Sequence, residues 1–344
     1  MPLAILAIGD SMDATLAVFE SSKSFIWYTV ALALLVSVVV WSLAVVLINS
    51  SGGGKKNNNQ TAEDKIKNEE SSSPARSSVQ EKNMAAGLPS RLYFRQLLAG
   101  EHVATTPKAQ QDGILFHIAR QMVNYMYVVG DAQTKQAVVV DACWDVDSVM
   151  RIAQKDGMTV TSAVATHYHF DHIGGALPKK MGVPIELNIP GFKELNENYE
   201  LPLYLHASEH DAASKQTGAP TSAMRPLVDG ERVAVSDAVS LKVLHTPGHS
   251  MGGCCLVVEV DGTPAVCISG DTVFPGSCGR LDLPESNRDS MFDSLSRLRR
   301  DLTPDSLPIY PGHAYGGKSS TVGAEKARGL LREMSKEQWR AMHG

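Results

Sequence analysis

The sequence predicts an α+β domain that follows an apolar helix and a polar linker, and three observations support this order. First, residues 25–48 carry no charged side chain. Second, residues 51–90 contain no aromatic side chain and almost no large aliphatic one. Third, the chain from residue 91 to residue 344 mixes strand-like runs with single helical segments and hairpins. About 250 residues suffice for one large domain with its own core.

The uncharged run from Phe25 to Ile48 predicts a transmembrane helix. At 1.5 Å per residue it would be about 36 Å long, which spans a hydrocarbon core of about 30 Å with some tilt. A signal peptide has a shorter apolar region, of about 7–15 residues, and a buried core helix is the other alternative. We therefore expect a short amino-terminal segment (1–24), a transmembrane helix (25–48), a disordered tether (49–90) and a folded domain (91–344).

Charge indicates the orientation of this single-pass membrane protein. Lys23 is the only cationic side chain before the apolar run, whereas four lysines follow it within about 20 residues: Lys55, Lys56, Lys65 and Lys67. The excess of lysine stays on the cytoplasmic side of a membrane, so we expect the folded domain in the cytosol. Five cysteines without a C-x-x-C pair agree with reduced thiols. A net charge of −5 argues against a nucleic-acid partner.

The domain shows strand and helix signals in close alternation. Runs rich in Val and Tyr predict strands within residues 124–131, 136–143 and 161–167. Apolar residues at helical spacing predict a helix within 145–157 and a second within 289–302. Asp261-Gly262 predicts a hairpin turn. The insertion at residues 183–203 is expected to be a surface loop, which either shapes access to a site or covers a sheet.

A histidine-rich motif directly follows the third predicted strand. It reads Thr-His-Tyr-His-Phe-Asp-His-Ile-Gly-Gly over residues 166–175. In extended chain His167 and His169 point the same way, so two imidazoles can converge on one metal ion. Asp171 and His172 follow at the turn and can serve a second ion. The alternative is a surface loop that happens to be rich in histidine.

Three further polar residues stand at strand exits marked by glycine: His249, Asp271 and His313. Each alone would be an ordinary loop residue. Together with the motif they complete the ligands that a pair of ions needs, since a carboxylate can bridge two ions. His206 and His210 are expected to be structural or surface residues, and Cys278 is the cysteine whose role is least defined.

These motifs, in this order, resemble the glyoxalase II (hydroxyacylglutathione hydrolase) group of the metallo-β-lactamase-fold hydrolases over residues 112–318. The resemblance implies a four-layer αββα sandwich with the metals at one edge. It also implies two divalent metal ions, with zinc favoured and iron or manganese as alternatives. On this resemblance His167, His169 and His249 bind the first ion, Asp171, His172 and His313 bind the second, and Asp271 bridges them. We count Asp171 and Asp271 as catalytic residues as well.

The resemblance further implies a hydrolase that attacks a thioester, such as a hydroxyacylglutathione, with a hydroxide shared by the two ions. Arg280 and Tyr315 would then contact the substrate, although Leu281-Asp282 departs from the aromatic pair of glyoxalase II. One alternative is a persulfide dioxygenase with a single iron on His167, His249 and Asp271. The other is a non-catalytic binding module tethered to the membrane.

Overall fold

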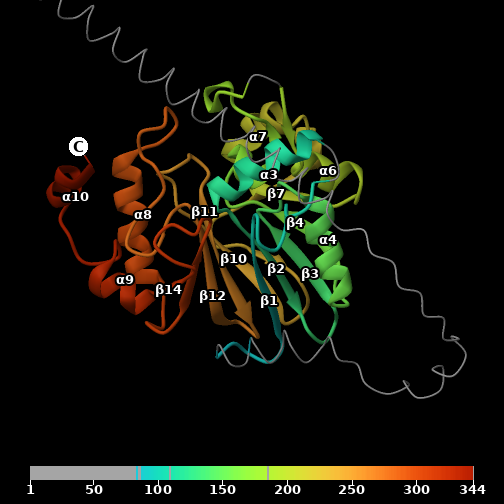
Figure 1. Ribbon diagram of the computed structural model, residues 1–344. Helices are drawn as coiled ribbons and strands as arrows, with labels where there is room; N and C mark the ends of the chain where they lie inside the picture. Colours follow the sequence, from blue (N-terminus) through green and yellow to red (C-terminus); the bar gives the residue numbers. More distant parts are fainter. Residues whose placement is uncertain (1–82, 84–86, 108–109, 184–185, 344) are drawn as a thin grey trace, which may run out of the picture. The chain divides into compact units, whose positions relative to one another are not determined.

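The computed structural model describes residues 83, 87–107, 110–183 and 186–343 (Figure 1). The transmembrane helix predicted at residues 25–48 and most of the predicted tether lie outside these residues. Among the residues that are described, no helix has both the length and the apolar character needed to cross a membrane.

Two mixed six-stranded sheets form the centre of the domain. The first has the order β1 (Leu92–Leu98), β2 (Tyr125–Asp131), β3 (Gln136–Val140), β4 (Thr159–Val164), β7 (Leu203–His206), β8 (Met224–Leu227). The second has the order β14 (Ser320–Thr321), β13 (Pro308–Pro311), β12 (Thr263–Gly270), β11 (Cys254–Val260), β10 (Val239–His245), β9 (Arg232–Ala234). Each sheet combines parallel with antiparallel pairs, which confirms the predicted α+β class.

Side-chain alternation along the strands divides the core into layers. In β2, Tyr127 and Val129 face the space between the sheets, whereas Met126 and Val128 face the opposite way. The outer face of the first sheet packs against four helices: α3 (Gln110–Met122), α4 (Val146–Lys155), α6 (Phe192–Glu197) and α7 (His210–Thr217). The outer face of the second packs against α8 (Arg288–Asp301), α9 (Val322–Arg328) and α10 (Lys336–His343) (Figure 1). These are the four layers of an αββα sandwich.

The predicted strands and helices lie close to their expected positions. The strands predicted within 124–131, 136–143 and 161–167 are β2, β3 and β4, and the two predicted helices are α4 and α8. Helix α4 begins after Asp145, whose carboxylate accepts a hydrogen bond from the Ser148 N–H (3.1 Å). Asp261 and Gly262 both have positive φ, 49° and 76°, as a two-residue type I′ turn between β11 and β12 requires.

The expectation of a surface loop at residues 183–203 is wrong for much of that segment. It contains β6 (Asn188–Ile189), paired with β5 (Gly175–Ala176), and helix α6. Ile189, Phe192 and Leu195 are fully buried in the core beneath the first sheet. The segment therefore covers a sheet, which is one of the two expected roles. The remaining short elements are α5 (Phe170–Ile173) and the 3₁₀ turns at Lys179–Met181, Ala207–Glu209 and Thr221–Ala223.

Packing of the domain begins before residue 91. Leu88 is buried in the core between the two sheets. Its backbone N–H donates to the carbonyl of Asn83 (2.9 Å), and the Asn83 amide donates to the carbonyl of Leu92 (3.4 Å). The last residues of the predicted tether therefore contribute to the folded domain.

Replacing Leu88 with alanine should lower the free energy of unfolding by about 2 kcal/mol, because a buried leucine side chain would leave a cavity between the sheets. Urea denaturation of the full chain in detergent would measure this change. Met342→Ala is the matched control, since Met342 is 50% exposed. A loss of less than about 0.5 kcal/mol in Leu88→Ala would show that the amino-terminal segment does not stabilise the core.

Candidate metal centre

The histidines and aspartates of the predicted site meet at one edge of the sandwich, where strands of both sheets end. Residues 165–169 and helix α5 follow β4 in the first sheet. His249 follows β10, Asp271 follows β12 and His313 follows β13, and these three strands run in the same direction. The two sheets are joined at this edge by backbone hydrogen bonds, from Tyr125 N–H to Gly312 O (2.8 Å) and from Cys254 N–H to Thr166 O (2.9 Å).

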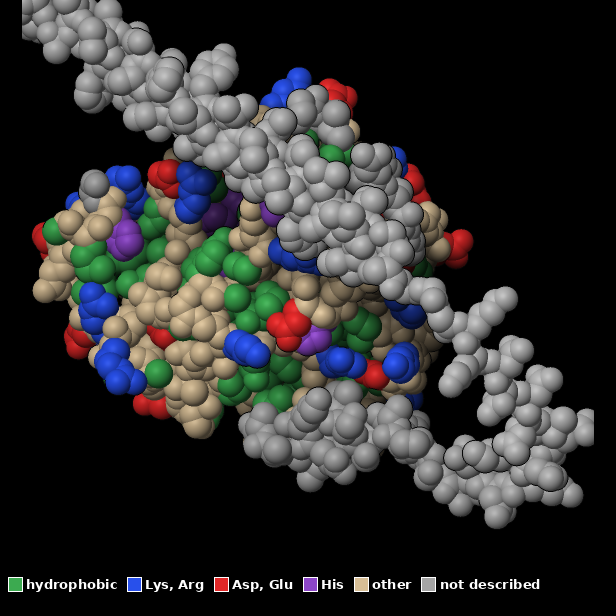
Figure 2. Space-filling view, in the orientation of Figure 1, with side chains coloured by type: hydrophobic (Ala, Val, Ile, Leu, Met, Phe, Trp, Pro, Cys, Tyr) green, Lys and Arg blue, Asp and Glu red, His purple; other side chains and the backbone are tan. Residues whose placement is uncertain are grey.

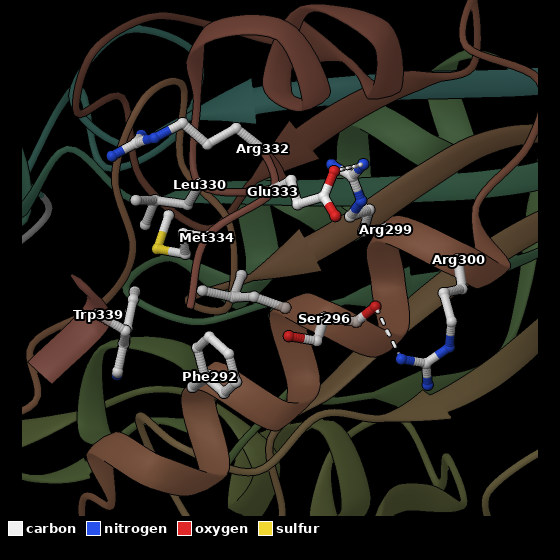
Figure 3. A pocket seen from close by; sticks show the side chains of 10 residues that line it. Phe292, Ser296, Arg299, Arg300, Leu330, Arg332, Glu333, Met334 and Trp339 are labelled. Atoms are coloured by element: carbon white, nitrogen blue, oxygen red, sulfur yellow. Dashed lines mark hydrogen bonds and ion pairs between the residues drawn. The ribbon is translucent and has the colours of Figure 1, made fainter. Parts of the chain in front are cut away.

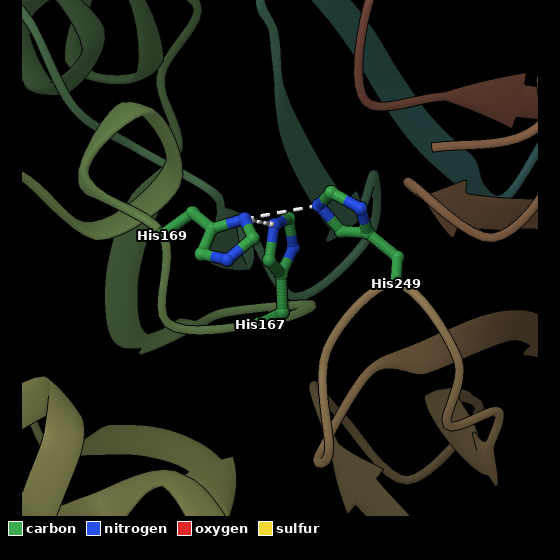
Figure 4. A group of neighbouring side chains, drawn as sticks. All are labelled: His167, His169 and His249. Atoms are coloured by element: carbon green, nitrogen blue, oxygen red, sulfur yellow. Dashed lines mark hydrogen bonds between the residues drawn. The ribbon is translucent and has the colours of Figure 1, made fainter. Parts of the chain in front are cut away.

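Three imidazoles, those of His167, His169 and His249, form a first donor group (Figure 4). The Nδ1 atom of His169 lies 3.0 Å from His167 Nε2 and 2.9 Å from His249 Nε2. Donors around a tetrahedral zinc ion with bonds of about 2.0–2.1 Å lie about 3.3 Å apart. The spacing of the three nitrogens is therefore close to that of a metal-binding set.

A second donor group consists of Asp171, His172 and His313, all buried. His313 Nε2 lies 3.3 Å from His172 Nε2 and 3.3 Å from Asp171 Oδ2. Asn124 supports this group, because its side-chain amide donates to Asp171 Oδ2 (3.2 Å). The Trp144 N–H donates to Asn124 Oδ1 (3.1 Å) and holds the amide in that orientation.

Asp271 lies between the two donor groups. Its Oδ2 atom is 3.4 Å from His249 Nε2 and 3.4 Å from His313 Nε2. Its Oδ1 atom lies 3.5 Å from His172 Nε2 and, among the described residues, has no hydrogen-bond partner although it is buried. A buried carboxylate oxygen without a partner is costly, and a cation shared between the groups would satisfy it. The residues present thus fit a pair of metal ions.

Electrostatics divides the two groups. Burial would raise the pKa of Asp171 and of Asp271, but the neighbouring His172 and His313 hold both pKa values well below the usual range. Burial and the surrounding imidazoles lower the pKa of His167, so this side chain stays neutral and able to bind a metal ion. Burial would also lower the pKa of His313, but the carboxylate of Asp271 raises it above its ordinary value. The pKa values of His167 and His249 are thus lowered in the first group, whereas those of His172 and His313 are raised in the second.

Each of the five histidines has a hydrogen-bonding partner at its other ring nitrogen. Such partners fix the orientation of a metal-binding imidazole. The pairs are His167 with Thr166 Oγ1 (3.1 Å), His169 with Glu285 (2.8 Å), His172 with Asp141 (3.0 Å), His249 with Arg280 O (2.9 Å) and His313 with Met122 O (2.7 Å). Asp141 also accepts hydrogen bonds from the backbone N–H and the hydroxyl of Thr166 (2.7 and 2.8 Å).

The seven residues that the motifs and the family resemblance predicted as metal-binding lie together in the structure, but their hydrogen-bonding partners were not predicted. Asp141 had a usable signal, because it directly follows strand β3 as Asp271 follows β12. Asn124 lies at the start of a predicted strand, where a polar side chain is common and does not indicate a functional site. Glu285 stands in a polar loop and is far from the motif in sequence, so no local pattern indicates its contact with His169.

The two predicted substrate-binding residues differ in position. The Tyr315 ring stacks on the His313 ring, with 4.8 Å between centroids and 7° between planes, and is 43% exposed. The Arg280 guanidinium forms a two-point ion pair with Asp282 at 2.9 and 2.7 Å. This pair lies on the surface beside the first donor group, since the Arg280 carbonyl accepts the hydrogen bond from His249.

The other candidates lie outside the donor groups. His206 stacks on His245 (4.0 Å between centroids, 6° between planes), and His210 contacts Leu205 O (3.0 Å). All five cysteines are free, and Cys278 is the one that is not fully buried. Burial and the nearby Asp271 raise the pKa of Cys278 to about 12, which makes it a poor nucleophile.

On the face shown in Figure 2, acidic and basic side chains are interspersed. A cavity of about 230 Å³ lies between α8 and residues 330–339 (Figure 3). Phe292, Leu330 and Trp339 form part of its wall. Arg299 and Glu333 also line it and form an ion pair (3.3 Å). None of its lining residues belongs to either donor group.

Comparison with known proteins agrees with this geometry. A probable polyketide biosynthesis zinc-dependent hydrolase of Bacillus velezensis is 27% identical over 195 residues, which are 57% of this chain and 75% of that protein. A hydroxyacylglutathione hydrolase of a Synechococcus species is 30% identical over 195 residues, 56% of this chain and 65% of that protein. The match thus spans slightly less than two thirds of the latter enzyme.

A solved structure and a family model identify the fold. The crystal structure of a metallo-beta-lactamase from Staphylococcus aureus has a TM-score of 0.56 and 24% identity to this chain, and covers 73% of this chain and 67% of that one. At this identity the likeness concerns the fold alone. Residues 119–313 match the model of the metallo-beta-lactamase superfamily. The chain therefore belongs to the metallo-beta-lactamase superfamily.

Proposed function

We propose that this protein is a dinuclear metal-dependent hydrolase of thioesters, with zinc as the favoured metal. The observation that carries the proposal is the position of Asp271, whose two oxygens face both donor groups. The names of two relatives, a zinc-dependent hydrolase and a hydroxyacylglutathione hydrolase, support the metal and the reaction class.

In this proposal the first donor group would hold one ion and the second group the other, and Asp271 lies next to both groups. Such a pair of ions lowers the pKa of water and stabilises negative charge on the attacked carbonyl group. The ionised carboxylates of Asp171 and Asp271 would serve catalysis as metal-binding groups that balance the positive charge. Asn124 keeps Asp171 in position, and the stacked ring of Tyr315 offers an exposed surface to the substrate beside His313.

A one-iron persulfide dioxygenase is the alternative that the sequence also resembles. An iron on His167, His249 and Asp271 would leave His169 without a role, although it lies within 3.0 Å of both histidines. It would also leave the buried second donor group without a cation. Both features favour the dinuclear hydrolase.

His169→Ala and Asp271→Ala should each abolish most thioester hydrolysis and lower the zinc content, because each removes a donor atom. Metal analysis combined with hydrolysis of S-lactoylglutathione would measure both effects, with two zinc ions per unaltered chain as the expected starting value. His206→Ala is the matched control, because His206 lies outside both donor groups. A fully active His169→Ala protein that holds one iron per chain and consumes oxygen would support the dioxygenase instead.

For the thiol carrier, we propose glutathione, held in part by Arg280. Arg280→Ala should then raise KM for a glutathione thioester more than it lowers kcat, since the contact would be made equally in the ground and transition states. The ion pair with Asp282 is exposed on both sides, with 65% and 60% of the side chains accessible, and exposed pairs are weak enough to exchange partners. Unchanged kinetic constants in Arg280→Ala would identify Arg280 as a structural partner of Asp282 only.

We also propose that residues 25–48 anchor the protein in a membrane with the catalytic domain in the cytosol, because the lysines that follow this segment outnumber those before it. The sequon Asn59-Gln60-Thr61 provides the test, since glycosylation occurs in the secretory lumen. Expression in a eukaryotic host should leave Asn59 unmodified, as judged by treatment with a glycosidase. A shift in mobility after that treatment, absent in Asn59→Gln, would reverse the orientation. Asn49-Ser50-Ser51 lies at the end of the apolar run and is a poorer reporter.

A further inference from the structure

The loop between β12 and α8 contacts two of the three histidines of the first donor group, His249 and His169. Within residues 279–287, the Arg280 carbonyl accepts a hydrogen bond from His249 Nδ1 (2.9 Å). The Ser286 hydroxyl donates to the carbonyl of His249 (2.7 Å), and the Asn287 N–H donates to the carbonyl of Gly248 (2.7 Å). One short segment thus orients both the ring and the backbone of His249.

The same loop holds His169 through a side chain. Glu285 Oε1 lies 2.8 Å from His169 Nε2, and both side chains are mostly buried, with 14% of His169 and 25% of Glu285 exposed. A hydrogen bond from His169 Nε2–H to this carboxylate leaves the lone pair on Nδ1. Nδ1 is the atom that faces His167 and His249. The carboxylate therefore selects the ring form that can bind a metal ion, and it makes that nitrogen more basic.

The second donor group is oriented by other parts of the chain. His172 contacts Asp141, directly after β3, and His313 donates to the carbonyl of Met122, at the end of α3. Neither contact involves residues 279–287. A change at Glu285 should consequently affect the two groups unequally.

We propose that Glu285 is a positioning residue that sets the metal affinity of the first donor group independently of the second. This inference rests on the proposed dinuclear centre, and it adds a contact that no local sequence motif marks. Loss of a carboxylate that orients a metal-binding histidine typically weakens metal binding about 10-fold to 100-fold. The effect should fall on one of the two ions.

Zinc titration of the full chain in detergent, after removal of bound metal and in competition with a chelator, would test this. The unaltered protein should bind two ions. Glu285→Ala should bind one of them about 10-fold to 100-fold more weakly and the other as before. Glu285→Gln should restore much of the affinity, because its amide oxygen can still accept the hydrogen bond from His169. Asp282→Ala is the matched control. It also removes a carboxylate from this loop, but that carboxylate pairs with Arg280 and not with a histidine of the donor groups.

The possible failures can be told apart. Native affinity for both ions in Glu285→Ala would overturn the inference, and so would an equal weakening of both ions, which indicates a general loss of structure. In a His169→Ala background the Glu285→Ala change should have no further effect on zinc affinity, and an additional loss there would also contradict the inference. Failure of the unaltered protein to bind zinc would instead contradict the proposed metal centre.

Discussion

The close approach of seven candidate metal-binding side chains is the constraint on which the rest of the structure depends. Nitrogen and oxygen atoms of the two donor groups lie about 3 to 4 Å apart in a buried region, where unsatisfied polar atoms are costly. Such an arrangement needs rigid support from the outside. The support comes from strand ends in two sheets and from the backbone hydrogen bonds that join those sheets. It also comes from a partner on the other ring nitrogen of each of the five histidines in the site.

Part of the fold follows from local sequence signals, because strands and helices depend on periodicity that a short window contains. The strands β2, β3 and β4, the helix α4 and the turn at Asp261-Gly262 were all predictable in this way. The packing of helix α6 was not, since the helix has only six residues, which are too few to show a clear helical periodicity. The four layers themselves came from family resemblance, because no local pattern specifies how two sheets stack.

The candidate site likewise contains residues that were predictable from the sequence and contacts that were not. Its donors were predictable because they cluster in one motif or stand beside glycine at strand exits, where chemistry concentrates. The orienting groups were not predictable, for two physical reasons. Two of them, the carbonyls of Met122 and Arg280, are backbone atoms that any residue supplies. Another, Glu285, reaches His169 across 116 positions of the sequence, a separation that only the tertiary fold closes.

The loop at residues 279–287 shows how these two kinds of contact differ in their consequences. Arg280 orients His249 through its carbonyl while its guanidinium points to Asp282 at the surface. A substitution of its side chain can therefore remove the ion pair with Asp282 and leave the contact with the His249 ring in place. In Glu285 a single group has both positions: the carboxylate that is partly open to solvent is also the group that holds His169. Within one loop, the side chain at residue 280 can therefore vary without disturbing a histidine of the donor groups, whereas the side chain at residue 285 cannot.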